Sequence, residues 1–196
     1  MVKPASPTAF LTAKLVELIA DSGLLPDGTL QFIAGGVGDL FDHLTEQDSL
    51  SFTGSAATAA KLRAHPVIIG RSVRFTAEAD SLNLSILGPD ATPGSAEFDL
   101  FVRGLVTEMT VKAGQKCTAI RRAFVPAGQM DTVIQAVSGQ LARFVIGSPS
   151  ADGVRMGALA SLDQRDEVRR SVKTLAGAGQ IVFGDPGKVD VVGADP

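Results

Sequence analysis

Cys117, the single cysteine of this 196-residue chain, is the side chain best suited to covalent chemistry. It lies in the stretch 113–120 and follows Gly114 and Gln115, a pair typical of a turn. Positive charge favours the thiolate, which is the nucleophilic form of cysteine. Four basic residues lie close to it in the sequence: Lys112, Lys116, Arg121 and Arg122. A lone thiol can equally be a small buried hydrophobic residue, so composition alone leaves both interpretations open.

A second candidate group is the carboxylate of Glu78, in the stretch 75–83. We place Glu78 at the end of a strand, where parallel α/β proteins bind ligands in a crevice. A carboxylate in such a place can take a proton from water and act as a general base. From these residues alone, we prefer the alternative, an exposed loop carboxylate without a chemical role.

A third candidate is the turn Thr53-Gly54-Ser55, between an expected strand and an expected helix. Free backbone N–H groups and the helix dipole attract an anion at such a position. An ordinary N-cap by Ser55 explains the same residues, and the local sequence does not separate the two. The glycines of 35–38 are a weaker candidate, because Phe41 stands where a dinucleotide-binding loop needs its third glycine. We interpret them as a strand-to-helix turn.

The elements that position these residues alternate between strand and helix. Expected helices cover 7–22 with Ser6 as N-cap, then 39–44, 55–64 (ending before Pro66), 96–112, 129–144 and 161–175. Expected strands cover 30–34, 50–53, 84–87, 120–125 and 181–183. Alternation of this kind predicts an α/β fold with a parallel sheet and crossover connections.

The length allows one large domain or two small ones. Hydrophobic residues make up 45% of the chain, and the mean hydropathy of +0.23 is high for a soluble protein. We find no apolar run of membrane-spanning length and no signal peptide, so we expect no membrane association and a cytoplasmic location. The apolar excess therefore predicts faces that pack against protein, some of it outside this chain.

Composition argues against several other functions. A net charge of −3 gives no electrostatic footprint for nucleic acid, and without Tyr or Trp only Phe or His could stack on bases. One cysteine excludes an internal disulfide and fits a reducing compartment. His43 and His65 have no cysteine partners at metal-ligand spacing, so we expect no metal site.

Four landmarks occur in the order in which aldehyde dehydrogenases carry theirs: Lys3-Pro4-Ala5, 52–55, 75–83 and 113–120. The chain resembles that superfamily over essentially its whole length. Its residues 78–83, Glu-Ala-Asp-Ser-Leu-Asn, and 113–122, Ala-Gly-Gln-Lys-Cys-Thr-Ala-Ile-Arg-Arg, are similar to one branch. That branch oxidises coenzyme A-linked semialdehydes in aerobic phenylacetate and benzoate degradation. Most of the superfamily has Glu-Leu-Gly-Gly-Lys at 78–82, and the departure is shared with the branch.

The resemblance implies an incomplete α/β fold, a parallel-sheet sandwich of the aldehyde dehydrogenase type. Residues 1–77 would be the later part of the Rossmann-like dinucleotide-binding domain, and residues 78–196 the first part of the catalytic domain. Family segments that carry an oxyanion-stabilising Asn, a Glu on the nicotinamide ribose and the oligomerisation strands would lie outside the chain. We therefore expect an internal fragment that is inactive by itself and works within a homo-oligomer or a larger polypeptide.

The resemblance also implies catalytic roles. Cys117 would attack an aldehyde, in this branch a coenzyme A-linked semialdehyde, to form a thiohemiacetal. Transfer of hydride to a nicotinamide cofactor would leave a thioester on the sulfur. Glu78 would then activate water to release the carboxylic acid.

Cofactor binding would fall to the amino-terminal part of the chain. By resemblance, Lys3 reaches the adenosine ribose, and Ser55 with Thr53 and Gly54 contacts the pyrophosphate. Ser6 stands where the family often has a Glu that binds the 2′-hydroxyl. Without that carboxylate a 2′-phosphate is not repelled, so we expect NADP in preference to NAD, with NAD still open.

Two functions of other classes stay open. The chain could be a catalytically silent fragment that acts as a folding or interaction module. It could also be a cysteine thioesterase with a His base, although His43 and His65 have no recognisable partner. Nucleotide binding would argue against the first, and thioester hydrolysis without nucleotide would favour the second.

Overall fold

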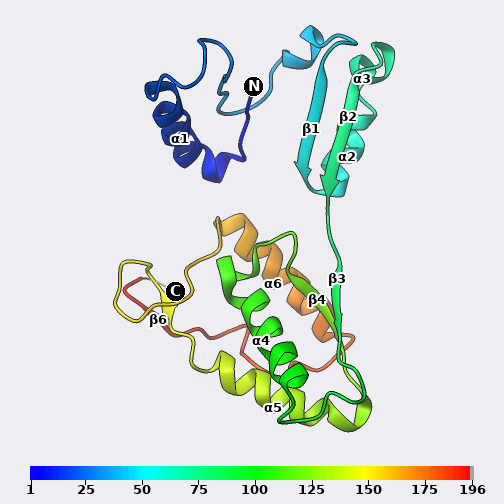
Figure 1. Ribbon diagram of the computed structural model, residues 1–196, viewed down its shortest axis with the longest axis vertical. Coiled ribbons are helices and arrows are strands. Elements are labelled where there is room, and N and C mark those ends of the chain that lie inside the picture. The colour runs from blue at the N-terminus through cyan, green and yellow to red at the C-terminus, as the bar shows by residue number, and fades with distance from the viewer. Residues whose placement is uncertain (195–196) are drawn as a thin grey trace. The chain divides into compact units, whose positions relative to one another are not determined.

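The computed structural model describes residues 1–194 and shows an α/β protein (Figure 1). It forms two compact units, Met1–Asp80 and a second that begins at Ser81. Within the described residues, three two-stranded sheets are present, and the strands of each pair run parallel. The parallel α/β class expected from the alternating pattern is therefore confirmed.

The first unit consists of a helical amino-terminal part and a β–α–β part. Its elements are η1 (Ser6–Thr8), α1 (Ala9–Asp21), η2 (Leu40–His43), β1 (Ser49–Gly54), α2 (Ala56–Arg63), α3 (Pro66–Gly70) and β2 (Arg74–Ala79). The two strands pair in parallel from Ser49 opposite Arg74 to Gly54 opposite Ala79. The helices α2 and α3 form the crossover between them, so both strands end at the same edge of the sheet.

Local caps explain where the crossover helices begin. The Ser55 hydroxyl oxygen accepts a hydrogen bond from the Thr58 N–H at 3.2 Å, which caps α2. The next helix, α3, has Pro66 at its start, and His65 Nδ1 accepts from the Val67 N–H at 3.4 Å. Proline suits a first helical position because its missing N–H has no acceptor there. Pro66 thus ends one helix, as expected, and begins another that the sequence pattern did not predict.

Two expectations for the first unit are wrong. Ser6 is not an N-cap: it is the first residue of η1, and α1 begins only at Ala9. The segment 30–34 is not a strand, because it forms only a single bridge between Val2 and Phe32. That bridge uses the Val2 N–H, which donates to the Gln31 carbonyl at 2.7 Å, and the Val2 carbonyl, which accepts from the Ile33 N–H at 2.9 Å.

The second unit is organised around its longest crossover. Its elements are β3 (Asn83–Ile86), α4 (Ala96–Thr110), η3 (Val111–Gly114), β4 (Ile120–Phe124), η4 (Ala127–Gln129), α5 (Met130–Leu141), β5 (Ile146–Gly147), α6 (Leu162–Ala176) and β6 (Val191–Val192). The strands β3 and β4 pair in parallel, and α4 connects them. Ser95 caps α4 by accepting from the Phe98 N–H at 3.2 Å.

The core of this unit lies along α4. Phe98, Val102 and Leu105 recur at helical spacing and are buried, so they form one apolar face. Leu87, Ala91 and Val133 complete the cluster, which packs α4 against α5 and the β3–β4 pair (Figure 1). Because α4 is packed along this face, its last turn and the loop that follows it have a fixed place within the second unit.

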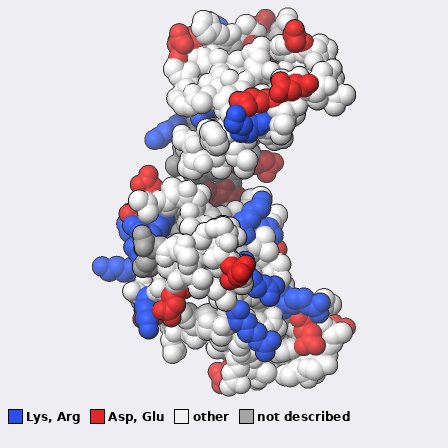
Figure 2. Space-filling model, turned by 90° about the vertical axis from the view of Figure 1, so that its left-hand side faces the viewer, with Lys and Arg blue, Asp and Glu red and all other residues white. Residues whose placement is uncertain are grey.

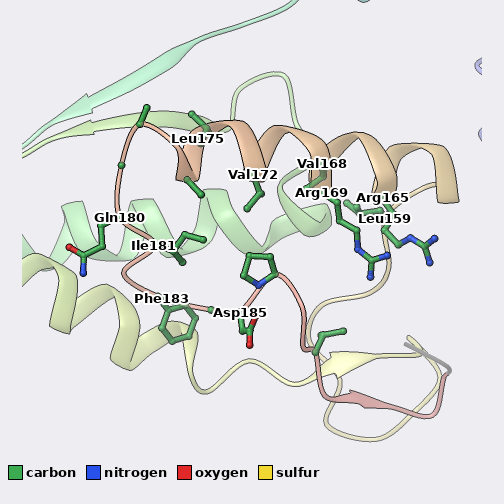
Figure 3. Close-up of a pocket in the computed structure, with 16 residues that line it drawn as sticks. Leu159, Arg165, Val168, Arg169, Val172, Leu175, Gln180, Ile181, Phe183 and Asp185 are labelled. Atoms are coloured by element: carbon green, nitrogen blue, oxygen red, sulfur yellow. The ribbon is translucent and has the colours of Figure 1, made fainter.

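The expected strand at 181–183 is wrong. Ile181 and Phe183 lie along α6 and, with Val168, Val172 and Leu175, line an apolar groove of about 730 Å³ (Figure 3). The last described strand is β6, which pairs with β5. A short apolar run can form a strand or line a groove, and the sequence pattern does not distinguish the two. In this chain, the run packs along α6.

Candidate active site

Cys117 is exposed and lies in the loop between η3 and β4. The chain enters this loop through three consecutive left-handed residues, Lys112 (φ 54°), Ala113 (φ 52°) and Gly114 (φ 72°). Only glycine adopts this conformation freely, and other residues cost on the order of 1–3 kcal/mol each. Contacts around the loop must offset that cost.

Side chains bind the carbonyl groups of this loop. Gln115 donates through Nε2 to the Lys112 carbonyl at 2.9 Å, and its Oε1 accepts from the Ala160 N–H at 2.9 Å. Arg121 donates to two carbonyls at 3.1 Å each, from Nη1 to Gly114 and from Nη2 to Lys116. The left-handed turn is therefore tied both to β4 and to the segment before α6.

The carbonyl of Cys117 has side-chain donors of its own. Asn83 Nδ2 donates to it at 2.7 Å and to the Ala119 carbonyl at 3.3 Å, and the Ser81 hydroxyl also donates to the Cys117 carbonyl. A register shift between Asn83 and Leu84 in the pairing of β3 with β4 accompanies these bonds. In the sequence, Ser81 and Asn83 stand out only as parts of the motif 78–83. Nothing in their spacing from Cys117 indicated the contact.

Part of the positive charge expected near Cys117 is offset by a carboxylate in the structure. Lys116 Nζ lies 2.8 Å and 3.0 Å from the two carboxylate oxygens of Glu108, and both side chains are half-buried. Glu108 therefore offsets the charge of Lys116. The guanidinium of Arg121 stays within the loop through its two backbone acceptors.

The first unit brings together Glu78 and the turn Thr53-Gly54-Ser55. Thr53 and Glu78 are register partners of the β1–β2 pair, at the carboxyl ends of the two strands. Residues opposite each other on neighbouring strands present their side chains on the same face of the sheet. All four residues are exposed. The structure thus places a carboxylate beside the strand-to-helix turn.

The turn itself is both a helix cap and a possible anion site. The Ser55 hydroxyl accepts from the Thr58 N–H and lies 3.0 Å from Thr58 Oγ1, so it completes the cap. That cap leaves the N–H groups of Ala56 and Ala57, which have no acceptor inside an α-helix, at the exposed start of α2. These groups fit a phosphate. A Cβ at Gly54 would lie 2.5 Å from the Phe52 ring, so glycine also lets this ring fold over the turn.

Lys3 and Ser6 lie on the exposed segment before α1. The Lys3 ammonium donates to the neighbouring Pro4 carbonyl at 3.2 Å, and the Val2 bridge holds the segment beside Phe32. These two residues, the turn 53–55 and Glu78 belong to the first unit. Cys117 belongs to the second.

Residues 1–194 contain no group of three or more His, Cys, Asp or Glu side chains that could hold a metal ion. They also contain no helix that is both long and apolar enough to cross a membrane.

Comparison with known proteins decides the family. The model of the aldehyde dehydrogenase family matches residues 1–191, almost the whole chain. The chain belongs to the aldehyde dehydrogenase family. The resemblance expected from the four sequence landmarks is thereby confirmed.

Among curated aldehyde dehydrogenases, the chain is 49% identical over 193 residues to the 3,4-dehydroadipyl-CoA semialdehyde dehydrogenase of Aromatoleum evansii. The match covers 98% of the chain and 38% of that protein. The chain thus spans little more than a third of the length of this curated relative.

Solved aldehyde dehydrogenase structures give the same fold. Betaine aldehyde dehydrogenase of Staphylococcus aureus in complex with NAD+ matches with a TM-score of 0.77 and 25% identity, over 90% of the chain and 34% of that protein. An NADP-dependent enzyme of E. coli matches with a TM-score of 0.78 and 26% identity, over 90% of the chain and 36% of that protein. The family fold is therefore present in part, and family members bind either NAD+ or NADP.

Proposed function

We propose that the chain carries the nucleophile, the general base and part of the cofactor site of an NAD(P)-dependent aldehyde dehydrogenase. The observation that carries the proposal is the exposed Cys117, held on a hydrogen-bonded loop in a chain of this family. The proposed substrate is a coenzyme A-linked semialdehyde from aromatic-compound degradation. The 49% identity to a semialdehyde dehydrogenase of that kind supports this choice.

The proposed domain division follows the sequence motifs. Residues 1–77 would form the later part of the dinucleotide-binding domain, and residues 78–196 the first part of the catalytic domain. The β1–α2–α3–β2 arrangement of the first unit supports the former, because strand-to-helix turns of parallel sheets bind cofactor phosphates. Cys117, after the central helix of the second unit, supports the latter.

In the proposed reaction, the Cys117 thiolate attacks the aldehyde carbon, and the carbonyl oxygen becomes an oxyanion. A bound nicotinamide cofactor supplies the acceptor for the hydride that leaves this carbon. The product on Cys117 is a thioester. Glu78 then takes a proton from water, the hydroxide attacks the thioester carbonyl, and the C–S bond breaks to give a carboxylic acid and the free thiolate.

The same proposal assigns the cofactor contacts. The N–H groups at the start of α2, with Thr53, Gly54 and Ser55, would hold the pyrophosphate. Lys3 would contact the adenosine ribose, and Ser6 would leave space for a 2′-phosphate. NADP is the proposed cofactor, with NAD as the alternative.

A dehydrogenase assay of the complete gene product tests the proposal. Reduced nicotinamide is measured with NADP and NAD against coenzyme A-linked and simple aliphatic semialdehydes. We expect turnover that disappears in Cys117→Ala and is kept in Ser150→Ala, a change at another exposed position. Turnover that survives Cys117→Ala would contradict the proposal. Thioester hydrolysis that needs no nucleotide would instead identify a cysteine thioesterase.

A second candidate function is an interaction module without catalysis. The observation that favours it is the number of large apolar side chains that are exposed, among them Phe10 at 77% and Leu175 at 70%. We propose that these faces pack against further parts of a larger polypeptide or a second copy of the chain. A complete gene product that binds neither NADP nor NAD in a titration would favour the module over the enzyme.

A further inference from the structure

The two peptide groups on either side of the Cys117 Cα atom are each held by side chains. On the amino-terminal side, the Lys116 carbonyl accepts from Arg121 Nη2 at 3.1 Å. On the carboxyl-terminal side, the Cys117 carbonyl accepts from Asn83 Nδ2 at 2.7 Å and from the Ser81 hydroxyl. Arg121 lies on β4, Asn83 is the first residue of β3, and Ser81 precedes β3 by two residues; the two strands are paired.

The planarity of the peptide bond turns these contacts into a constraint on the nucleophile. The Lys116 carbonyl and the Cys117 N–H belong to one rigid plane, so a donor that fixes the carbonyl also fixes the direction of the N–H. With the planes on both sides held, φ and ψ of Cys117 are held as well. The direction of its Cα–Cβ bond follows, and only the χ1 rotation of the thiol stays free.

We propose that Arg121, Ser81 and Asn83 are positioning residues that fix the thiol and the N–H of Cys117 for attack on a carbonyl. The proposal rests on the proposed function, in which that attack creates an oxyanion next to Cys117. A backbone N–H aimed at the developing charge stabilises it, and loss of one such donor costs about a hundredfold or more in rate. Arg121 also holds the Gly114 carbonyl, so the same guanidinium fixes the left-handed turn that leads into the loop.

The hydroxyl of Ser81, in the motif 78–83, has a structural role, because it donates to the Cys117 carbonyl. The resemblance implies a glycine at this position in most of the superfamily, which has Glu-Leu-Gly-Gly-Lys there. A glycine has no side chain and cannot donate to the Cys117 carbonyl. In this chain the hydroxyl adds a donor to the carbonyl that Asn83 already binds.

Two reactions of the same thiol separate positioning from simple reactivity, and neither needs nucleotide. Acylation by p-nitrophenyl acetate adds Sγ to the ester carbonyl, passes through an oxyanion and expels p-nitrophenolate. Alkylation by iodoacetamide displaces iodide at a saturated carbon and creates no oxyanion. In the complete gene product we expect Arg121→Met to lower the acylation rate about ten- to a hundredfold. The alkylation rate at its high-pH plateau should change by less than about threefold, because the thiolate itself is intact.

Matched variants complete the test. Arg122→Met removes the neighbouring arginine, for which residues 1–194 show no hydrogen bond to the loop, and should leave both reactions unchanged. Ser81→Ala should lower acylation, and Ser81→Thr, which keeps the hydroxyl, should restore it. The Ser81 pair also tests the proposal if Arg121→Met fails to fold, as shown by its circular dichroism.

Three results would overturn the positioning role. The first is an acylation rate that is unchanged in both Arg121→Met and Ser81→Ala. The second is a loss of alkylation rate as large as the loss of acylation rate in these variants, and the third is a loss of acylation rate in Arg122→Met as large as that in Arg121→Met. Each would mean that these side chains only support the fold. Failure of the proposed function looks different, because the positioning effect would be present while the wild-type protein reduces no nucleotide.

Discussion

Glu78 and Thr53 stand opposite each other at the ends of β1 and β2, and both are exposed. If Glu78 is the general base for thioester hydrolysis, Glu78→Gln keeps its shape and removes its basicity. In the complete gene product, we expect hydrolysis to slow by about 10²- to 10⁴-fold while the first burst of reduced nicotinamide changes little. Stopped-flow absorbance measures both phases. An equal loss of both would assign Glu78 a structural role, and Ser51→Ala, at an exposed position of the opposite strand, serves as the control.

The proposed cofactor site makes the choice between NADP and NAD depend on a single residue. Ser6 is exposed on the segment before α1, and in that proposal a carboxylate at this position would repel a 2′-phosphate. We expect Ser6→Glu to raise the Kd of NADP about tenfold or more and to affect NAD far less. Titration of the complete gene product with both nucleotides measures the two constants. Ser22→Glu adds the same charge just beyond the other end of α1, and an equal effect there would show that discrimination lies elsewhere.

At the scale of elements, the β5–β6 pair depends on one glycine. Gly147 is buried, and a Cβ at this position would lie 2.0 Å from the Val192 carbonyl oxygen. We expect Gly147→Ala to separate the two strands and to lower the free energy of unfolding by about 1–3 kcal/mol. Hydrogen exchange at the Ser148 N–H, which donates to Val192 at 2.9 Å, should become faster.

A second glycine provides the matched control. Gly139 lies inside α5, and apart from its chain neighbours and the backbone of its own helix nothing lies within 4 Å of the position of its Cβ. Gly139→Ala should therefore raise the free energy of unfolding by up to about 1 kcal/mol, because alanine favours a helix. Equal effects of the two substitutions would show that strand contact at Gly147 is not the cause.

The turn that leads into β1 makes stability depend on pH. Asp48 accepts from the Thr45 N–H at 2.7 Å and from the Thr45 hydroxyl at 2.9 Å. These bonds lower the pKa of Asp48 below its ordinary value of 3.8. The folded state therefore favours the carboxylate: its stabilisation is fully present above the ordinary pKa and is lost as the pH falls through the lowered one.

Asp48→Asn removes that dependence, because the amide does not titrate. We expect wild type to have the higher Tm at neutral pH and the difference to shrink below about pH 4. Calorimetry at several pH values measures it. A difference that stays constant in acid would mean that another group governs this turn.

The elements predicted correctly are those with a strong local signal. The helix α4 has an apolar face at helical spacing, and α2 begins at a serine that forms its cap. The failures are short or depend on distant contacts. The segment 30–34 finds only Val2 as a partner, and α3 is only five residues long.

The candidate site also has features that the sequence predicts and features that depend on distant contacts. The residue types of Cys117 and Glu78 are visible in the sequence, and so is the turn at Ser55. The donors to the Cys117 carbonyl are not visible, because Ser81 and Asn83 precede Cys117 by 36 and 34 residues. Their contact depends on the pairing of β3 with β4 and on its register shift, which no local pattern encodes.

At the scale of the whole molecule, the exposed surface is large. The chain exposes 13750 Å², whereas a compact monomer of this mass would expose about 8,800 Å², and two separate domains of the same total mass roughly 10,500 Å². Figure 2 shows wide areas without charged side chains on one face. Phe10, Leu11 and Leu18 of α1 are each more than two-thirds exposed. Surface of this kind is typical of faces that other protein covers.

We therefore expect the 196-residue chain on its own to bind a hydrophobic dye such as ANS strongly and to self-associate at micromolar concentration. Phe10→Ser with Leu18→Ser should reduce both effects without lowering the Tm, because these side chains contribute little to the core. Dye fluorescence and sedimentation velocity measure the outcome. A monomeric chain with weak dye binding would contradict the expectation.

The bonds from Ser81 and Asn83 to the Cys117 carbonyl also set an order of events during synthesis. They close a loop of about 36 residues, and closing a flexible loop of this length costs on the order of 3 kcal/mol in chain entropy. The closure becomes favourable only when α4 has packed and β4 has left the ribosome to pair with β3. Until then, Cys117 lies on an unconstrained chain. If Cys117 is the nucleophile, we expect the nascent polypeptide to orient it late, after α4 has packed and β4 has paired with β3.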